Sequence, residues 1–249
     1  MFTTRKSIIL LLLLAFIAGC GGGGSGGNVA GDPAEPTLWV PRDLESGTWA
    51  VMGSSTAAGA GATFGNGWVE LLQLDFPDHA TGLANVAKGG AVTYQGLSAL
   101  TPPVPGRPSP DPAANIDEAL FHNPVLLLVS YPSNDTGVGY AEDETVNNIL
   151  AIRSFALSHF VPVIVVSSQP RSDFTPDQLF KLTRIDERLA SAVGPCFVEV
   201  RSVLEDESGK PAAEYSHDGV HPNNAGHGVI AERVRAVIES GECVVLVGE

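Results

Sequence analysis

The stretch TWAVMGSSTAAGAGATFGNGW runs from Thr48 to Trp68 and changes character abruptly at Gly53. The apolar residues before this glycine are typical of a buried strand. Two adjacent serines, Ser54 and Ser55, come next, and mostly small residues follow them. A strand that turns into a helix through small residues can expose a serine hydroxyl together with the backbone N–H of the same residue. The stretch therefore predicts a reactive serine at the end of a strand, and leaves open which of the two it is.

Similar apolar, β-branched runs recur along the chain and alternate with segments of helical periodicity. A run that is apolar on both alternating faces indicates a strand buried on both sides, as in a parallel sheet. This alternation predicts a three-layer, doubly wound α/β fold with a mostly parallel sheet. The expected strands are 48–53, 83–88, 124–131, 162–168 and 196–203, and the expected helices are 67–76, 142–160, 175–193 and 223–240.

The N-terminal 36 residues differ in composition from the rest of the chain. Residues 1–19 have a basic start and then an apolar run, which is the layout of a secretory signal peptide and is too short for a transmembrane helix. The run ends in IAGC, which resembles a bacterial lipobox, so we expect a lipid on Cys20; an ordinary signal peptide with a chance cysteine is the alternative. Glycine-rich residues 20–36 are expected to form a flexible tether, and 37–249 a single domain.

Two further segments stand apart from the regular pattern. The proline-rich residues 100–115 cannot form a regular element, and we expect them to form a long surface loop. The apolar residues 242–249 are expected to form an additional terminal strand or a tail attached through Cys243.

Charge and cysteine content limit the possible partners and cofactors. The formal net charge of −14 argues against nucleic acid or an anionic membrane surface as a partner, because phosphates would be repelled. Apart from Cys20, the chain has only Cys196 and Cys243, which could form one disulfide in an oxidising compartment. Two buried free thiols are the alternative. The spacing of these cysteines matches no metal-binding pattern, so no metal is expected.

Polar residues follow the ends of several expected strands, which is where sites form in doubly wound sheets. Gly89 and Gly90 follow the second strand, and Asn134 follows the third. Far downstream, Asp218 and His221 lie three residues apart, just before the last helix. A hydroxyl, an exposed backbone N–H, a side-chain amide and an Asp/His pair are the groups that acyl transfer requires.

In order and spacing, these segments resemble the SGNH (GDSL-type) hydrolase superfamily, whose blocks read GDSxxxG, an Asn-containing strand followed by glycine, GxND, and DxxH. The corresponding segments here are GSSTAAG (53–59), NVAKGGAVT (85–93), PSND (132–135) and DGVH (218–221), which together span essentially the whole domain. Ser54 stands where the family has aspartate, and Pro132 where it has glycine. The resemblance implies the family's flavodoxin-like α/β fold and a serine hydrolase that needs no cofactor.

The resemblance also implies a role for each candidate residue. With Gly53 and Gly59 in register with the glycines of the first block, the nucleophile is Ser55. His221 would be the general base, oriented by Asp218. The oxyanion hole would consist of the N–H groups of Ser55 and Gly90 and the side-chain amide of Asn134.

Taken one by one, the same residues have ordinary structural interpretations. Asp218 and His221 could be a helix cap and a surface histidine, and Asn134 a turn residue. His217 and His227 are nearby competitors for the role of base, but neither has an aspartate three residues upstream, where they have Glu214 and Asn224.

These expectations combine into an exported bacterial lipoprotein, at the outer membrane, the cell surface or in the periplasm, that contacts the membrane only through its N-terminal lipid. It would be a monomeric esterase that hydrolyses acetyl or other short acyl esters, of small molecules or glycans, through an acyl-enzyme on Ser55. A lipase or thioesterase for longer acyl chains is one alternative. A non-catalytic surface lipoprotein that keeps the fold to bind a glycan or a partner is the other.

Overall fold

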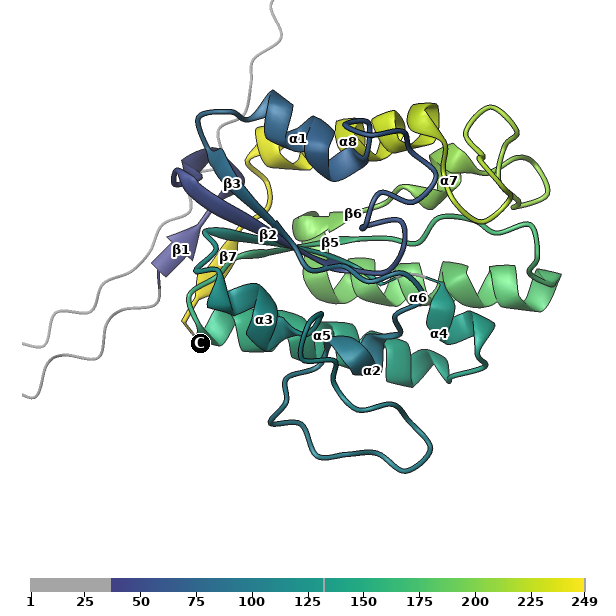
Figure 1. Ribbon diagram of the computed structural model, residues 1–249, viewed down its shortest axis with the longest axis horizontal. Helices are drawn as coiled ribbons and strands as arrows, with labels where there is room; N and C mark the ends of the chain where they lie inside the picture. The colour runs from purple at the N-terminus through teal and green to yellow at the C-terminus, as the bar shows by residue number, and fades with distance from the viewer. Residues whose placement is uncertain (1–36, 132, 249) are drawn as a thin grey trace, which may run out of the picture. The chain divides into compact units, whose positions relative to one another are not determined.

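The computed structural model describes residues 37–131 and 133–248. The expected signal peptide 1–19, the tether with Cys20, and Pro132 lie outside the described residues. Within them, a parallel five-stranded sheet lies between two layers of helices, which confirms the predicted three-layer α/β fold (Figure 1). No helix in the described part of the chain has the length and hydrophobicity needed to cross a membrane.

The sheet has the strand order β3-β2-β4-β5-β6, and every neighbouring pair is parallel. The chain passes from β2 to β3 at one edge and then crosses to β4, on the other side of β2. Such a reversal is where doubly wound sheets form their sites, outside the carboxyl ends of the strands. The strands are β2 (Gly47–Gly53), β3 (Ala80–Asn85), β4 (Leu126–Ser130), β5 (Val163–Val166) and β6 (Phe197–Val198).

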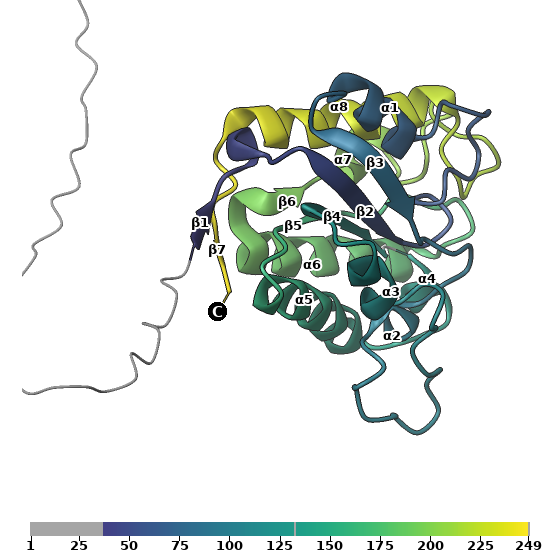
Figure 2. The same cartoon turned by 60° about the vertical axis from the view of Figure 1, so that its left-hand side comes forward.

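Helices cover both faces of the sheet. Helices α1 and α8 pack together on one face, whereas α3, α5 and α6 cover the other (Figures 1 and 2). The four helices predicted from the sequence correspond to α1, α5, α6 and α8, and Thr175 caps α6 through its side chain as its position before Pro176 suggests. The helices are α1 (Trp68–Asp75), α2 (Thr93–Gly96), α3 (Ile116–Phe121), α4 (Asn134–Gly137), α5 (Glu142–Ser158), α6 (Pro176–Val193), α7 (Arg201–Leu204) and α8 (Asn224–Ser240), with 3-10 turns η1 (Pro41–Asp43) and η2 (Gly194–Cys196).

Two strand predictions were wrong in their bounds. The second strand was expected at 83–88 but begins at Ala80, because β3 is a partly exposed edge strand that does not need a continuous apolar run. The strand expected at 196–203 ends at Val198. There the carboxylate of Glu199 accepts the N–H of Ser202 at 2.9 Å, which favours the helical turn α7 over further strand.

The ends of the domain are joined to each other and to the sheet. Strand β1 (Thr37–Trp39) pairs antiparallel with β7 (Val245–Val247), which lies within the expected terminal segment 242–249. A disulfide joins Cys196 to Cys243 across 47 residues of sequence. In the chain-entropy model, closing a loop of this length contributes about 4 kcal/mol to the free energy of unfolding.

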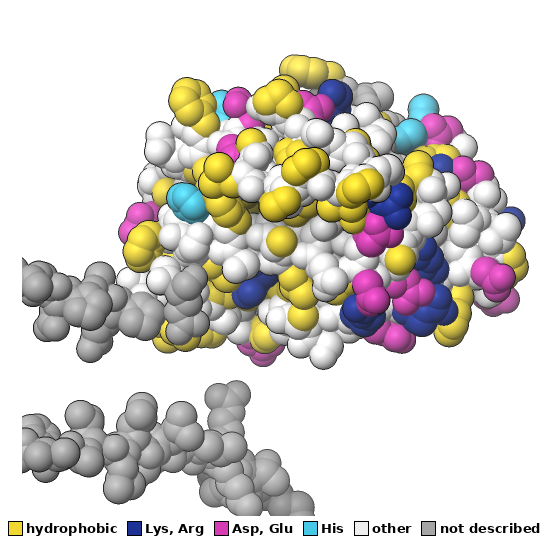
Figure 3. Space-filling model, turned by 90° about the horizontal axis from the view of Figure 1, so that it is seen from below, with side chains coloured by type: hydrophobic (Ala, Val, Ile, Leu, Met, Phe, Trp, Pro, Cys, Tyr) yellow, Lys and Arg dark blue, Asp and Glu magenta, His cyan; other side chains and the backbone are white. Residues whose placement is uncertain are grey.

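Ion pairs join the proline-rich loop to α5, and α5 to α6, on the face of the sheet that these two helices cover. Residues 100–115 contain no helix or strand, as predicted. Arg107 in this loop makes two hydrogen bonds to Glu144, at 2.6 and 2.9 Å, so the loop is attached to α5. Further pairs join the start of α5 to α6, for example Arg188 with Asp143 at 2.7 Å. Seen from this side in Figure 3, Lys and Arg side chains accordingly lie beside Asp and Glu side chains.

Candidate active site

The turn after β2 separates the two serines into different environments. A Cβ atom at Gly53 would lie 2.0 Å from the carbonyl oxygen of Ser130, so only glycine allows β2 to approach β4 this closely. Ser54 donates its N–H to that same oxygen at 3.0 Å and is only 2% exposed. Ser55, one residue further, is partly exposed at the carboxyl edge of the sheet.

The hydroxyl of Ser55 is the first member of a hydrogen-bonded chain. Its Oγ lies 3.0 Å from Nε2 of His221, and Nδ1 of His221 lies 2.8 Å from Oδ2 of Asp218. A carboxylate can only accept, so Nδ1 carries the hydrogen of the neutral ring and Nε2 is left as an acceptor for the Ser55 hydroxyl. This is the protonation pattern in which the serine can lose its proton to the histidine.

Hydrogen bonds within the turn from Asp218 to His221 stabilise the charged form of Asp218. The other carboxylate oxygen, Oδ1, accepts the backbone N–H groups of Val220 at 2.9 Å and His221 at 2.8 Å. The hydrogen bonds from the ring and backbone of His221, and then that from Val220, hold the pKa of Asp218 well below its usual range. The turn ends at Pro222, and the next residue, Asn223, is the N-cap of α8.

Two of the three residues expected to form the oxyanion hole, Gly90 and Asn134, line a common cleft. Asn134 opens α4 and donates one N–H of its amide to the carbonyl of Ala91 at 2.9 Å, which leaves its second N–H available to a ligand. Gly90 has a φ of +78°, a conformation that favours glycine, although a Cβ there would meet nothing within 4 Å. Both residues line the cleft.

A buried carboxylate joins the loops that carry these two donors. Asp135 is fully buried and accepts the N–H of Thr93 at 2.9 Å and its hydroxyl at 2.5 Å. Thr145 on α5 adds a hydroxyl at 3.2 Å. Burial raises the pKa of Asp135, whereas these hydrogen bonds favour its charged form. Asp135 follows Asn134 directly and Thr93 lies three residues after Gly90, so this contact fixes one loop against the other.

The two competing histidines lie in different surroundings from His221. His227 is fully buried; its Nδ1 accepts the N–H of Trp68 at 3.2 Å and its Nε2 donates to the carbonyl of Ala60 at 3.0 Å. Burial lowers its pKa, and both ring nitrogens are occupied by these structural contacts. His217 has an exposed side chain, and its backbone N–H donates to the carbonyl of His221.

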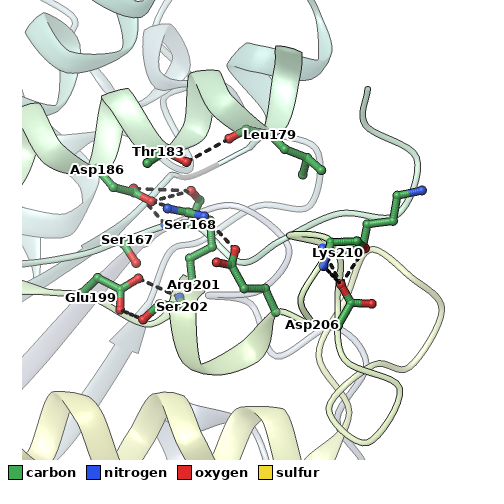
Figure 4. Close-up of polar contacts among 12 residues, drawn as sticks. Ser167, Ser168, Leu179, Thr183, Asp186, Glu199, Arg201, Ser202, Asp206 and Lys210 are labelled. Atoms are coloured by element: carbon green, nitrogen blue, oxygen red, sulfur yellow. Dashed lines mark hydrogen bonds and ion pairs between the residues drawn. The ribbon is translucent and has the colours of Figure 1, made fainter. Parts of the chain in front are cut away.

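A buried ion pair anchors the segment that leads to Asp218 and His221. Arg201 on α7 donates from Nε to Asp186 of α6 at 2.9 Å (Figure 4). It also donates from Nη1 to Glu205 at 2.7 Å. The side chains of Asp186 and Arg201 are only 6% and 12% exposed. Burial raises the pKa of Asp186 to about 7 in spite of the arginine.

We expect Arg201→Met to lower the free energy of unfolding by about 3 kcal/mol at pH 8, because Asp186 would be left buried without its partner. The loss should be smaller at pH 5.5. With its folded-state pKa raised, Asp186 takes up a proton on folding, and the stability from this uptake is present at low pH and lost as the pH rises through 7. Urea denaturation at both pH values measures the difference.

Arg184→Met is the matched control for this prediction. Arg184 pairs with Glu142 in a more exposed position, with side chains 39% and 24% exposed, and its loss should change stability by less than about 1 kcal/mol at either pH. Equal losses at pH 8 and pH 5.5 in Arg201→Met would show that the charge of Asp186 is not the cause.

Sequence reasoning included Asp135 in the PSND block but assigned it no role, and it missed Arg201 and Asp186; the contacts of all three join different elements of the fold. It also missed Arg171, whose Nη1 lies 3.4 Å from Oδ1 of Asn134. The rule that sites lie after strand ends could have suggested Arg171, which follows β5 by a few residues.

A serine, a histidine and a carboxylate hydrogen-bonded in this order, at the carboxyl edge of a doubly wound sheet, are the arrangement of a serine hydrolase. The model of the GDSL-like Lipase/Acylhydrolase family matches residues 51–229. The chain belongs to this family, and it is a hydrolase. Among the described residues, no three His, Cys, Asp or Glu side chains are grouped so that they could hold a metal ion.

Several solved structures have a similar fold. A GDSL-like lipase from Bacteroides thetaiotaomicron VPI-5482 is 21% identical, with a TM-score of 0.57 over 78% of this chain and 88% of that one. A member of the lipolytic protein G-D-S-L family from Veillonella parvula DSM 2008 is 14% identical, with a TM-score of 0.54 over 76% and 97%. A two-domain esterase active on acetylated mannans is 15% identical, with a TM-score of 0.56 over 81% of this chain and 51% of that one. A search of curated proteins found no match.

Proposed function

We propose that the protein is a serine esterase that hydrolyses short acyl esters, above all acetyl esters, through an acyl-enzyme on Ser55. The observation that carries this proposal is the hydrogen-bonded chain from Ser55 through His221 to Asp218. A non-catalytic binding protein would have no need of this chain, nor of a serine hydroxyl that is partly exposed beside it.

In the first half of the proposed reaction, Ser55 Oγ attacks the ester carbonyl carbon while His221 Nε2 takes the hydroxyl proton. The charge that develops on the carbonyl oxygen is stabilised by the N–H groups of Ser55 and Gly90 and the amide of Asn134. Asp218 stabilises the imidazolium. When the tetrahedral intermediate collapses, the ester C–O bond breaks and the alcohol leaves with the proton from His221.

In the second half, water replaces the alcohol. His221 takes a proton from the water as its oxygen attacks the acyl carbon, and the same donors stabilise the second tetrahedral intermediate. The bond to Ser55 Oγ then breaks, the serine recovers its proton from His221, and the carboxylic acid leaves. Each proton that His221 accepts is returned, so no cofactor is consumed.

The preference for a short acyl group is supported by the pocket beside His221, whose volume of about 10 Å3 is enough for one small group and not for an alkyl chain. In the neighbouring cleft, an alkyl chain would have to displace water from the charged side chains of Arg171 and Asp173 without replacing its hydrogen bonds. The similar fold of an esterase active on acetylated mannans is compatible with an acetylated carbohydrate as substrate. The enzyme would act at the cell exterior, held by a lipid on Cys20, which mass spectrometry of the mature N-terminus would test.

Hydrolysis of p-nitrophenyl acetate and p-nitrophenyl octanoate by the purified protein tests this proposal. We expect kcat/KM for the acetate to exceed that for the octanoate by about tenfold or more, because neither the small pocket beside His221 nor the charged cleft beside Asn134 accommodates an alkyl chain. A preference for the octanoate would instead support a lipase or thioesterase. No hydrolysis of either ester would support a non-catalytic binding protein.

A further inference from the structure

The segment that follows β5 connects the two sides of the active site. Ser172 donates its N–H and its hydroxyl to the carbonyl of Gly219, at 2.8 and 3.0 Å, within the turn that carries Asp218. One residue earlier, Arg171 reaches the opposite side, where its Nη1 lies 3.4 Å from Oδ1 of Asn134. The segment therefore holds Arg171 in a defined place beside an expected oxyanion donor.

A cleft of about 360 Å3 opens at this place, and this volume is within the range of small-molecule sites. It lies between α4 and the start of α6, two helices that contact each other (Figure 1). Its lining includes Gly90, Asn134, Val138, Arg171, Asp173 and Phe174.

Arg171 and Asp173 form a rigid pair in the wall of this cleft. Nε and Nη2 of Arg171 donate to the two carboxylate oxygens of Asp173 at 2.9 and 2.6 Å, and the guanidinium carbon lies 4.6 Å from the ring centroid of Phe174. Of the five N–H groups of Arg171, these bonds and the contact with Asn134 use three. Within the described residues, the other two have no hydrogen-bond partner in the protein.

The carboxylate of Asp173 can accept further hydrogen bonds while it is paired with Arg171. Its side chain is 52% exposed, and each oxygen keeps a lone pair beyond the one that accepts from Arg171. The hydrogen bonds from Arg171 lower the pKa of Asp173, so this carboxylate is charged at neutral pH. The cleft thus offers N–H donors and carboxylate acceptors side by side, with no net charge from the pair.

This chemistry fits hydroxyl groups better than it fits an anion or a hydrocarbon. A hydroxyl both donates and accepts, so neighbouring hydroxyls can bind Arg171 and Asp173 together. An anion would be attracted by the guanidinium but repelled by Asp173. A hydrocarbon would desolvate an ion pair and return no hydrogen bond.

We propose that this cleft is a polyol subsite, in which Arg171 and Asp173 bind neighbouring hydroxyl groups of a sugar whose ester is cleaved at Ser55. The subsite rests on the proposed esterase function and adds to it the class of alcohol that the enzyme recognises. Arg171 and Asp173 determine which ester is bound, whereas Ser55 and His221 carry out its hydrolysis.

The test compares two acetyl esters that differ in their alcohol: methyl glucoside monoacetates, whose other hydroxyls are free, and p-nitrophenyl acetate, which has no hydroxyl. For Arg171→Gln and Asp173→Asn, we expect the ratio of kcat/KM for the glucoside esters to that for p-nitrophenyl acetate to fall about tenfold or more. This is the loss expected for a hydrogen bond to a charged group. The change should be mainly in KM for the glucoside esters.

Arg184→Gln is the matched control, because Arg184 also pairs with a carboxylate and lies 4.5 Å above a phenyl ring, that of Phe180, outside the cleft. It should leave the ratio unchanged. Equal losses on both esters in Arg171→Gln would make Arg171 a positioning residue for Asn134 and would overturn the subsite. A wild-type enzyme active only on p-nitrophenyl acetate would overturn the subsite but not the esterase function, and one inactive on both would overturn both.

Discussion

Replacing Ser55 with alanine should reduce ester hydrolysis by roughly 10⁶-fold in kcat, because the reaction then loses its nucleophile and the triad acts as one unit. The rate of p-nitrophenyl acetate hydrolysis by the purified variant measures this loss. The variant should fold normally, since Ser55 is partly exposed and, among the described residues, its hydroxyl is hydrogen-bonded only to His221.

Ser54→Ala is the control that separates the two adjacent serines. Ser54 is buried, and its backbone N–H, which alanine retains, donates to Ser130. The variant should keep most of the wild-type activity. If Ser54→Ala is inactive and Ser55→Ala is active, the alignment of this turn with the family's first block is wrong, and Ser54 is the nucleophile.

The second large effect is expected at the far end of the chain. His221→Ala should lower kcat about as much as Ser55→Ala, and Asp218→Asn by roughly 10⁴-fold, because an amide cannot hold the ring in the required tautomer. The double variant Ser55→Ala/His221→Ala should lose little more than either single variant. Steady-state kinetics of the four proteins test this pattern.

The pH dependence follows from the same roles. His221 can accept the serine proton only when it is neutral, so activity should rise with pH along one limb. Asp218, whose pKa lies well below its usual range, stays charged over that limb and adds none of its own. His217→Ala should keep the wild-type profile, since the side chain of His217 is exposed and makes no hydrogen bond to Ser55, Asp218 or His221. Near-normal turnover in Asp218→Asn would mean that another acid orients His221.

The sequence predicted the buried parts of the fold better than its edges. Strand β4 is buried at every residue, so it reads as one apolar run, and α6 has both a clear amphipathic pattern and a capping threonine. The edge strand β3 is partly exposed and lacks such a pattern. Helices α2, α4 and α7 have four residues each, too few to show a helical period.

For the site, the residues within short motifs could be predicted from sequence, whereas their supports could not. Asp218 and His221 lie three residues apart in one turn, and Ser55 follows a strand, so local spacing indicates all three. Asp135 accepts hydrogen bonds from Thr93, which lies 42 residues before it in the chain, and Arg201 of α7 pairs with Asp186 of α6. Such contacts depend on packing between distant elements, which no local pattern records.

The most direct test of the account is to identify the residue that reacts with a fluorophosphonate. The probe phosphonylates an activated serine, and fragmentation of the labelled peptide by mass spectrometry can distinguish Ser54 from Ser55. We predict a single adduct on Ser55, absent from Ser55→Ala and strongly reduced in His221→Ala, because the histidine must accept the serine proton. An adduct on Ser54, or labelling of Ser55 at the wild-type rate without His221, would contradict the proposed triad.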